Sequence, residues 1–598
     1  MFDPGTSMLD FITETPLGQG IRLISGSQLL PYPEERPGFQ LPRQYLELLQ
    51  PREKEEEHCS PDELDSAQNS STGTIATGSQ ESDDIESLRH VKTNASIRST
   101  PYRSDQTTTE QASNPIRPKS NPIKPQKTTD GIILVDWYTE DDAANPQNWS
   151  SGKKFLTMFS LCCYTCTIYS AGPIYATAEE GIQKEFGVSA VAATLGLALY
   201  VLAYGIGDLL FAPLSEIPII GRNPVYWVTF LIYWVLTFPE AVTNGFGSLL
   251  ALRFWLGFFG SPALANGGAT VSDLFSVINI PYGLSFWVVA AWFGPSCGPL
   301  IGGFAAQAKG WRWPMWEITW MASISLVFLM VLMPETSAPN ILLRRAKRLR
   351  KLTGNLKIQS QSEIDQHHMK PSEILAAALL IPMEIMIKDP AIFFVNLYSG
   401  FFYGVFYTFF EVIPIVMPSV YGFNLGQTGL SFVSCMIGAY LAFACYYLYL
   451  RFYMIPDNIK NGLWEPEHRL VVTIVGACLF PVALFLFAWT ARPSIHWIVP
   501  LIGIAIFCMG HFFVMQSLFV YLPFSYPKYA ASLFAGNSLW RSGVAGGSVV
   551  FARPLFLNLG VGRGVTILAA VSVLGIFGTV AIYVYGAKLR ARSKFAQS

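Results

Sequence analysis

GPSCGPLIGG, residues 294–303, places four glycines and two prolines inside a long apolar segment. In a helix interior each glycine costs about 1 kcal/mol and each proline about 3 kcal/mol relative to alanine. Three of the glycines are four residues apart and share one helix face, where a second membrane helix can approach closely. The prolines permit a bend. We expect a bent helix whose glycine face makes a moving contact between two halves of the protein, with a static crossing as the alternative. The residues of this segment are Gly294, Pro295, Gly298, Pro299, Gly302 and Gly303.

The rest of the chain also has the composition of a membrane protein. Of its 598 residues, 51% are hydrophobic and 14% are charged. A helix needs about 20 apolar residues to cross the ~30 Å hydrocarbon core of a bilayer. About twelve runs of that kind predict an all-α, multi-pass membrane protein. They lie near 155–175, 190–213, 224–243, 247–268, 282–306, 314–333, 390–417, 427–450, 470–490, 496–522, 530–555 and 561–586.

Several function classes find no support in the residues. The first twenty residues, MFDPGTSMLDFITETPLGQG, lack the basic and apolar regions of a secretory signal. No phosphate-binding glycine loop is present, and no basic segment interleaved with aromatics indicates nucleic-acid binding. Eight of the nine cysteines fall in predicted spans, and none has the spacing of a metal site. We therefore expect no enzyme activity, no cofactor, no metal and no nucleic-acid partner.

Charge and composition divide the chain into five regions. Residues 1–130 are polar and low in complexity, which predicts a disordered cytoplasmic tail. Two six-helix bundles, 131–334 and 390–587, flank a connection at 335–389 that contains the basic stretch LLRRAKRLRK. Residues 588–598 form a short basic tail. Because lysine and arginine collect on the cytoplasmic side of membrane proteins, we expect both termini and the connection in the cytoplasm. The basic stretch predicts an amphipathic helix on the inner leaflet.

This organisation is typical of transporters. Two groups of six spans joined by a long basic connection match proteins built from two related halves around a midplane cavity. We expect such a protein to work as a monomer in the lipid bilayer and to bind a small-molecule substrate.

Three motifs carry a resemblance to a known family. GPSCGPLIGG is similar to the fifth-helix antiporter motif of the drug:proton antiporter branch of the major facilitator superfamily. APLSEIPIIGRNP (212–224) resembles the signature of the loop between the second and third spans. LLALRFWLGFFGSPALANGG (249–268) resembles the fourth-helix motif. The similarity covers about residues 131–595 and is to fungal multidrug exporters with twelve spans. It implies the major-facilitator fold and proton-coupled export at the plasma membrane.

The loop signature assigns gating roles. The resemblance implies that Glu216, Gly221 and Arg222 form the gate, with Glu216 and Arg222 as a latch on the inner side. The sequence departs from the signature at Ala212, where the family has glycine, and at Asn223, where it has a basic residue. The contacts of this loop can therefore differ from those of the family.

Charged residues inside the spans are candidates for proton coupling, because each costs at least about 2.5–3.5 kcal/mol at mid-bilayer. The resemblance implies that Arg253 acts on an acid across the cavity; a structural hydrogen bond is the alternative. Glu411 can carry a proton, and the rival interpretation is an ion pair with Arg541. Asp208 is either a protonation site or a hydrogen-bonding residue between helices. His511 is a candidate relay or a neutral core histidine.

Aromatic side chains are dense in the seventh, eighth and tenth spans, and flat apolar walls with a few polar groups suit amphipathic substrates. The candidate cavity residues are Tyr403, Tyr407, Phe410, Asn537 and Arg541.

Together these features predict a proton-coupled antiporter that exports drugs, toxins or other small organic compounds by alternating access. One alternative is a proton symporter or facilitator that imports a nutrient. Another, from a different class, is a transporter-like nutrient sensor that signals through its tail.

Overall fold

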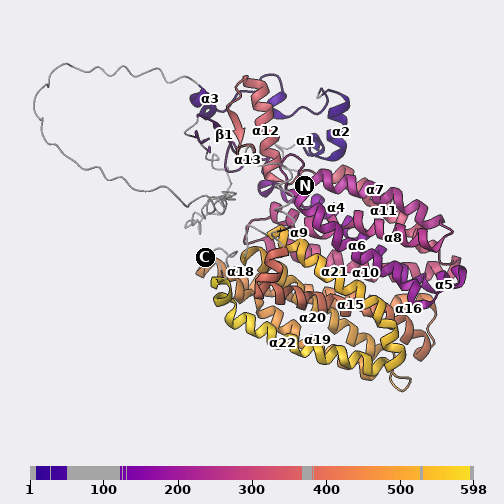
Figure 1. Cartoon of the computed structure of the whole chain (residues 1–598). Helices are drawn as coiled ribbons and strands as arrows, with labels where there is room; N and C mark the ends of the chain where they lie inside the picture. The colour runs from indigo at the N-terminus through magenta and orange to yellow at the C-terminus, as the bar shows by residue number, and fades with distance from the viewer. Residues whose placement is uncertain are drawn as a thin grey trace, which may run out of the picture.

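The computed structural model describes residues 8–26, 28–49, 122–123, 125–128, 131–366, 380, 383–462, 464–525 and 530–592. Its long helices lie side by side, with the first half of the chain in magenta above the second half in orange and yellow (Figure 1). The end of the bundle that carries the connection between the halves is called the linker end here. The opposite end, at α5 and α16 in Figure 1, is called the far end.

The N-terminal half contains six helical spans. Ser150 caps the first of them, because its hydroxyl accepts a hydrogen bond from the Lys153 amide at 3.4 Å. The fourth span is made of two consecutive helices, of which the second begins at a proline. The elements are α4 (Ser151–Ala171), η3 (Pro173–Thr177), α5 (Glu179–Phe186), α6 (Ala190–Glu216), α7 (Arg222–Val242), α8 (Phe246–Gly260), α9 (Pro262–Leu274), α10 (Ile280–Lys309) and α11 (Trp313–Leu332).

The C-terminal half repeats this plan. Asp389 caps its first span by accepting a hydrogen bond from the Ala391 amide at 3.0 Å. The next span continues through a π-helical turn, η4, into α18. The elements are α15 (Pro390–Tyr421), α16 (Leu425–Ser431), α17 (Val433–Tyr449), η4 (Leu450–Met454), α18 (Ile455–Asn461), η5 (Pro466–Leu470), α19 (Val471–Thr490), α20 (Ile498–Ser525), α21 (Ala530–Leu559) and α22 (Val561–Arg592).

Within the described part of the chain, eleven helices are long and apolar enough to cross a membrane. The twelfth expected span is α21, whose 30 residues include polar and glycine-rich stretches. It packs along α6 of the other half and along α15 of its own half. Its polar composition fits a helix that is covered by protein.

The halves meet along two sides of the bundle. On one side α6 packs on α21, and on the other α10 packs on α16 and α17. The second contact is closest where Gly429 of α16 meets Pro299 of α10, because a Cβ at Gly429 would overlap the Pro299 carbonyl. Gly303 makes a similar approach, since its Cβ would lie 2.8 Å from the carbonyl oxygen of Leu425.

The rest of the glycine face of α10 lies elsewhere than expected. Cβ atoms at Gly294 and Gly298 would lie 2.6 Å from carbonyl oxygens of α4, and one at Gly302 would lie 2.5 Å from Ile174 of η3. These three glycines therefore join two helices of the same half, and only Gly303 faces the other half. The prediction that this glycine face contacts the other half is wrong for three of the four glycines. The orientation of α10 about its own axis places them against α4 and η3.

We expect Gly429→Ala to impair closure of the far end, because the added methyl group holds α10 and α16 apart. Overpacking of this kind costs about 1–3 kcal/mol. Transport by purified protein in liposomes should fall severalfold, together with the thermal unfolding temperature. Gly547→Ala is the matched control, since nothing lies within 4 Å of its added Cβ. Equal behaviour of the two variants would contradict the close contact.

A small folded unit, called the cap here, lies at the linker end (Figure 1). The strand β1 pairs in parallel with β2, with Ile133 opposite Ile358. The helix α12 carries the basic stretch of the connection and packs on η1 and both strands. The elements of the cap are α1 (Met8–Thr13), α2 (Pro16–Ile24), η1 (Pro33–Glu35), α3 (Arg43–Leu49), β1 (Ile133–Val135), α12 (Ala338–Thr353), β2 (Ile358–Ser360) and α13 (Gln361–Gln366).

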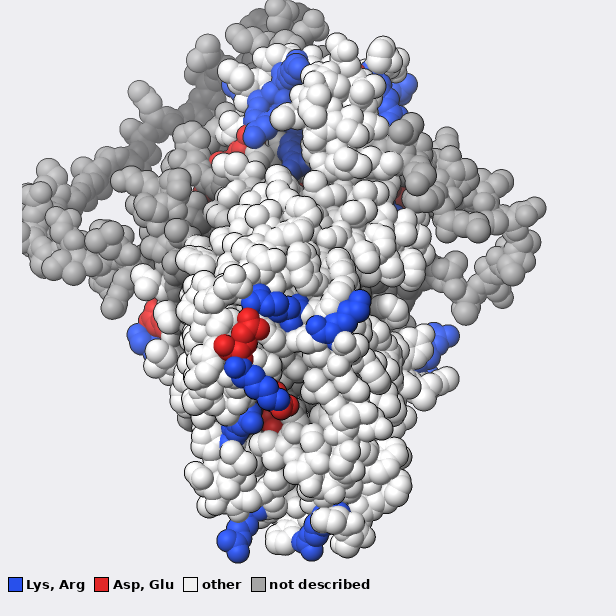
Figure 2. Space-filling view, turned by 90° about the vertical axis from the view of Figure 1, so that its right-hand side faces the viewer, with Lys and Arg blue, Asp and Glu red and all other residues white. Residues whose placement is uncertain are grey.

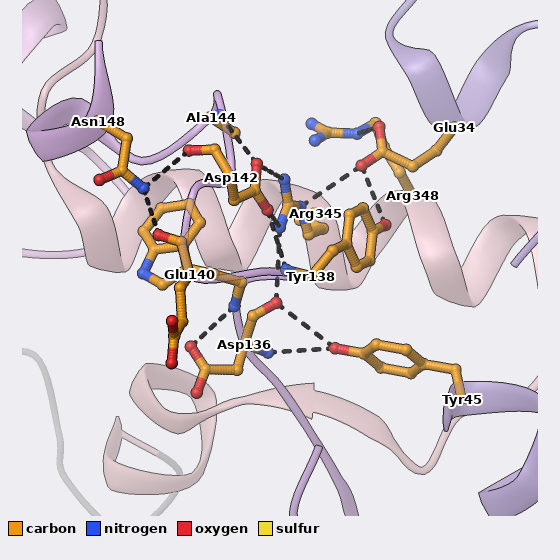
Figure 3. A network of polar contacts seen from close by, with 11 residues as sticks. Glu34, Tyr45, Asp136, Tyr138, Glu140, Asp142, Ala144, Asn148, Arg345 and Arg348 are labelled. Atoms are coloured by element: carbon orange, nitrogen blue, oxygen red, sulfur yellow. Dashed lines mark hydrogen bonds and ion pairs between the residues drawn. The ribbon is translucent and has the colours of Figure 1, made fainter. Parts of the chain in front are cut away.

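Ion pairs explain why α12 is held against the other elements of the cap. Arg345 lies 2.7 Å from an Asp142 oxygen and 3.4 Å from a Glu34 oxygen, and Arg348 lies 3.1 Å from the other Glu34 oxygen (Figure 3). Tyr138 donates a hydrogen bond to Glu34 at 3.2 Å (Figure 3). Burial alone would raise the pKa of Asp142, but the hydrogen bonds from Arg345 hold it below its usual value. The basic face of α12 thus contacts acidic side chains of the cap.

The cap differs from the expected disordered tail. The helices α1, α2, η1 and α3 lie within residues 8–26 and 28–49, and α2 packs on α7 and α11 of the bundle. The remainder of the predicted tail, apart from 122–123 and 125–128, lies outside the described residues, as do 593–598 of the short C-terminal tail. The order of residues 8–49 comes from contacts with segments far along the chain, which local composition does not reveal.

Candidate functional site

A small cavity lies between the halves, near the middle of the bundle. A second, smaller space adjoins it and shares Tyr169 and Tyr403. Both halves contribute to the walls, which are mostly aromatic. The lining side chains used below are Tyr169, Trp287, Trp292, Tyr403, Phe406, His511 and Arg541.

Two polar groups interrupt the aromatic wall. The guanidinium of Arg541 lies over the ring of Tyr403, 4.9 Å from its centroid, and the side chain is almost fully buried. The His511 ring stands edge-on to Trp292, with centroids 4.9 Å apart. Arg541 Nε and His511 Nδ1 have no hydrogen-bond partner among the described residues. A ligand in the cavity can therefore accept a hydrogen bond from Arg541 while it stacks on aromatic rings.

The predicted cavity residues divide into two groups. Tyr403 and Arg541 line the larger cavity, and Tyr407 lines the smaller one. Phe410 does not line either space and stacks on Phe432, with centroids 5.2 Å apart. Asn537 is also outside, because its amide donates to side chains of α15 and joins α21 to that helix. Sequence periodicity could not separate these positions, since aromatic residues cover more than one face of α15.

Asp208 forms a contact between the halves. It is completely buried on α6, and one of its oxygens accepts a hydrogen bond from Ser538 of α21. The other oxygen has no partner among the described residues. Of the two predicted roles, the structure shows the hydrogen bond between helices. Ser538, the donor, lies one helical turn before Arg541 on α21.

Arg253 forms a buried ion pair that the sequence analysis did not anticipate. Its Nη1 lies 3.0 Å from a carboxylate oxygen of Glu240 on α7, and neither side chain is exposed. Its other donors bond to backbone carbonyls, including Ala171 at 2.9 Å and Gly196 at 3.3 Å. The guanidinium also lies 4.5 Å from the ring centroid of Tyr175. Arg253 therefore ties four segments of the N-terminal half together instead of facing an acid across the cavity.

Glu411 is not paired with Arg541. It is buried in α15 toward the far end, and the charges that act on it come from Glu179 of α5 and Arg553 of α21. Glu411 does not pair with Arg541 because it is Arg553, twelve residues further along α21, that lies at the level of Glu411. Sequence reasoning missed Glu179, which stands outside the apolar runs that were searched for charges.

The predicted gate at the linker end has different partners from those expected. Arg222 pairs with Asp273 of α9 at 2.6 Å, whereas Glu216 is exposed at the end of α6. Gly221 has a φ of 79°, and a Cβ there would lie 2.5 Å from a carboxylate oxygen of Glu335. Glu335 also accepts a hydrogen bond from the Arg222 amide at 3.1 Å. Arg222 is thus bonded to Asp273 and Glu335, and the charge of Glu216 acts on it without a direct bond.

The comparisons with known proteins agree with this architecture. The family model for the Major Facilitator Superfamily matches residues 157–550. The chain belongs to the major facilitator superfamily. This membership confirms the resemblance noted in the sequence and the all-α fold with two six-helix bundles. The protein is a multi-pass membrane transporter and not an enzyme.

Relatives in this superfamily cover most of the chain. The MFS-type transporter pyvG of Aspergillus violaceofuscus is 40% identical over 98% of this chain and 100% of its own length. The Cycloheximide resistance protein of Candida maltosa is 34% identical, with the same coverage. Fluconazole resistance protein 1 of Saccharomyces cerevisiae is 37% identical over 77% of this chain and 85% of its own length.

Solved structures share the fold at much lower identity. A POT family transporter in complex with a thioalcohol-conjugated peptide is 12% identical, has a TM-score of 0.54, and covers 75% of this chain and 100% of its own. The proton:xylose symporter XylE of the major facilitator superfamily is 15% identical, has a TM-score of 0.52, and covers 73% of this chain and 96% of its own.

Proposed function

We propose that this transporter exports drugs, toxins or similar small organic compounds in exchange for protons. The observation that carries the proposal is the aromatic cavity between the halves, which has one buried cation, Arg541, in its wall. The relatives whose names refer to cycloheximide and fluconazole resistance support a role in drug efflux. The basic linker end faces the cytoplasm in this proposal, and the protein lies in the plasma membrane as a monomer.

Alternating access would use the two contacts between the halves. The α10–α16 contact is closest at the far end, and Asp208 with Ser538 joins α6 to α21 toward the linker end. With both contacts formed, the halves touch at both ends of the bundle. Rocking of the halves would break one contact and keep the other.

Proton coupling requires an acid that responds to this movement. Glu411 and Asp208 are the candidates, because both are buried where the halves meet and each has an oxygen without a hydrogen-bond partner among the described residues. Arg253 holds the N-terminal half together and would contribute to coupling only as a positioning residue. The gate residues Gly221 and Arg222 would transmit the movement at the linker end.

Proton movement in liposomes tests this proposal. Purified protein is reconstituted with a pH-sensitive dye inside, a pH gradient is imposed, and benomyl, fluconazole or a polyamine is added. We expect at least one compound to drive proton movement, and we expect Glu411→Gln to abolish that movement while the compound still binds. Substrate movement without protons would favour a facilitator, co-directional movement would favour a symporter, and binding without any flux would favour a sensor.

A further inference from the structure

Two buried carboxylates from opposite halves lie near each other at the far end. Glu179 is the first residue of α5 in the N-terminal half, and its side chain is almost fully buried. Glu411 belongs to α15 in the C-terminal half and is 2% exposed. The two side chains lie close enough for the charge of Glu411 to act on Glu179. A pair of like charges therefore spans the seam between the halves.

A single arginine accompanies these two acids. Arg553 of α21 has its Nη1 at 3.8 Å from a Glu179 oxygen, which is too long for a hydrogen bond. One oxygen of Glu179, one oxygen of Glu411 and Nε of Arg553 have no hydrogen-bond partner among the described residues. The group is thus incompletely bonded despite its burial, which is costly for charged side chains.

The neighbouring charges do not compensate this group. Arg253 also acts on Glu179, but it is bonded to Glu240 and to backbone carbonyls. On α5, Glu180 pairs with Lys184 in the solvent. The elements packed against α5 and α15 also carry Tyr175 of η3, Asp208 and Glu216 of α6, His511 of α20, Arg541 of α21, and Arg563, Lys588 and Arg590 of α22, the last of which pairs with Glu467. On α5 itself, Glu185 pairs with Arg312.

None of these remaining groups supplies the missing charge. Tyr175 donates its hydroxyl to a backbone carbonyl, and Arg563 is exposed. Asp208 and Glu216 lie toward the linker end, while His511 and Arg541 line the central cavity. When Glu179 and Glu411 are both ionised, the seam holds one negative charge more than Arg553 balances.

A proton on one carboxyl would remove the excess charge. Burial and the nearby Glu411 charge raise the pKa of Glu179 well above its usual value. A protonated carboxyl also no longer repels its ionised neighbour, as in other pairs of acids that share a site. The surface at this end is mostly uncharged, with a small mixed group of acidic and basic side chains near its middle (Figure 2).

We propose that Glu179 and Glu411 together bind one proton from the far-end solution, and that this proton closes the seam between the halves. The proposal names the place of proton uptake and rests on the proton exchange proposed above. The proton adds to one carboxylate, which becomes a neutral acid, and Arg553 keeps its charge. Loss of that proton restores two ionised carboxylates, whose repulsion favours separation of the halves and hydration of the seam. Acid at the far end therefore favours the closed form.

This order suits an exchanger. When the far end is open and the substrate has left, a proton enters the seam and closes it. The protein is then free to open at the linker end. Coupling arises because proton binding to the pair is most favourable when the two halves touch.

Distance measurements across the far end test the proposal directly. Spin labels are attached through unnatural amino acids at Gly247 of α8 and Ser494 between α19 and α20, which are exposed on opposite halves. The full chain in lipid nanodiscs is measured at pH 5 and pH 8.5. We expect the longer distance to gain at least tenfold in population relative to the shorter one at the higher pH. Glu179→Gln and Glu411→Gln, each alone, should keep the shorter distance at both pH values.

Glu180→Gln is the matched control, because Glu180 is the next residue on α5 but is exposed. It should respond to pH like the wild type. A distance that does not change with pH in the wild type, or a response that survives in both Gln variants, would overturn the proposal. Thermal unfolding shows whether each variant is folded. If one of the two Gln variants does not fold, the other one still tests the proposal.

The same protein preparations separate this proposal from the proposed function. Drug-driven proton movement without a pH-dependent distance would leave proton exchange standing and reject this uptake site. A pH-dependent distance that requires both acids, without any drug-driven proton movement, would support the pH-sensitive seam and reject proton exchange.

Discussion

Arg253→Met is expected to lower the free energy of unfolding by about 3–5 kcal/mol, because it leaves the Glu240 carboxylate buried without its partner. Neither side chain of the pair is exposed, so water cannot replace the lost contact. The double variant Arg253→Met/Glu240→Gln should recover most of the loss, since it removes both charges. Thermal unfolding of purified protein in detergent measures the three proteins side by side.

The double variant also separates a structural role from a role in coupling. We expect it to retain drug-driven proton movement, because Arg253 and Glu240 then serve only to hold the N-terminal half together and neither carries the coupled proton. Normal stability of Arg253→Met together with lost proton movement would contradict this assignment. It would support the role in coupling that the family resemblance implies. Arg312→Gln is a useful control, since Arg312 forms a partly exposed ion pair with Glu185 at the far end.

Arg541→Gln is expected to weaken substrate binding about thirtyfold with little loss of stability. A desolvated interaction between a cation and aromatic rings contributes about 2 kcal/mol, which corresponds to about thirtyfold in affinity. Arg541 Nε has no hydrogen-bond partner among the described residues, so it remains available to a ligand in the cavity. Quenching of tryptophan fluorescence on addition of a drug measures the affinity, because Trp287 and Trp292 line the same cavity.

Arg563→Gln provides the comparison for this experiment, since Arg563 is exposed on α22. It should bind drugs like the wild type. Arg541→Lys keeps the positive charge and loses the planar guanidinium, so an intermediate affinity is expected. Unchanged affinity in Arg541→Gln would show that the substrate is held by the aromatic walls alone.

The membrane fold was accessible from the sequence because the length and hydropathy of a span are local properties. Even α21, which is less apolar than the other spans, was predicted as the run 530–555. The rotation of a helix about its axis is not local. For this reason three glycines of α10 were assigned to the wrong neighbour, and Phe410 and Asn537 to the wrong environment.

Pairing between charged residues was the least predictable feature. The sequence identified Arg253, Arg222 and Glu411 as important charges, and hydrogen bonding to the backbone was one of the two roles expected of Arg253. It did not identify the partner side chains Glu240, Asp273 and Arg553. Glu240 lies among the last residues of an apolar run, and Glu335 lies in the connection after α11, so neither stood out as a membrane charge. The cap was missed for a similar reason, because Glu34 and Arg348 are 314 residues apart.

The cap has a consequence for the energetics of the transport cycle. Its main contacts with the bundle are made to α7 and α11, both in the N-terminal half, and α12 belongs to the same folded unit. If the halves rock as rigid bodies, the cap travels with one of them and is equally intact at every stage. It then deepens all the energy minima of the cycle by the same amount and leaves their relative heights unchanged. Loss of the cap would shorten the lifetime of the folded transporter without altering the direction in which it pumps.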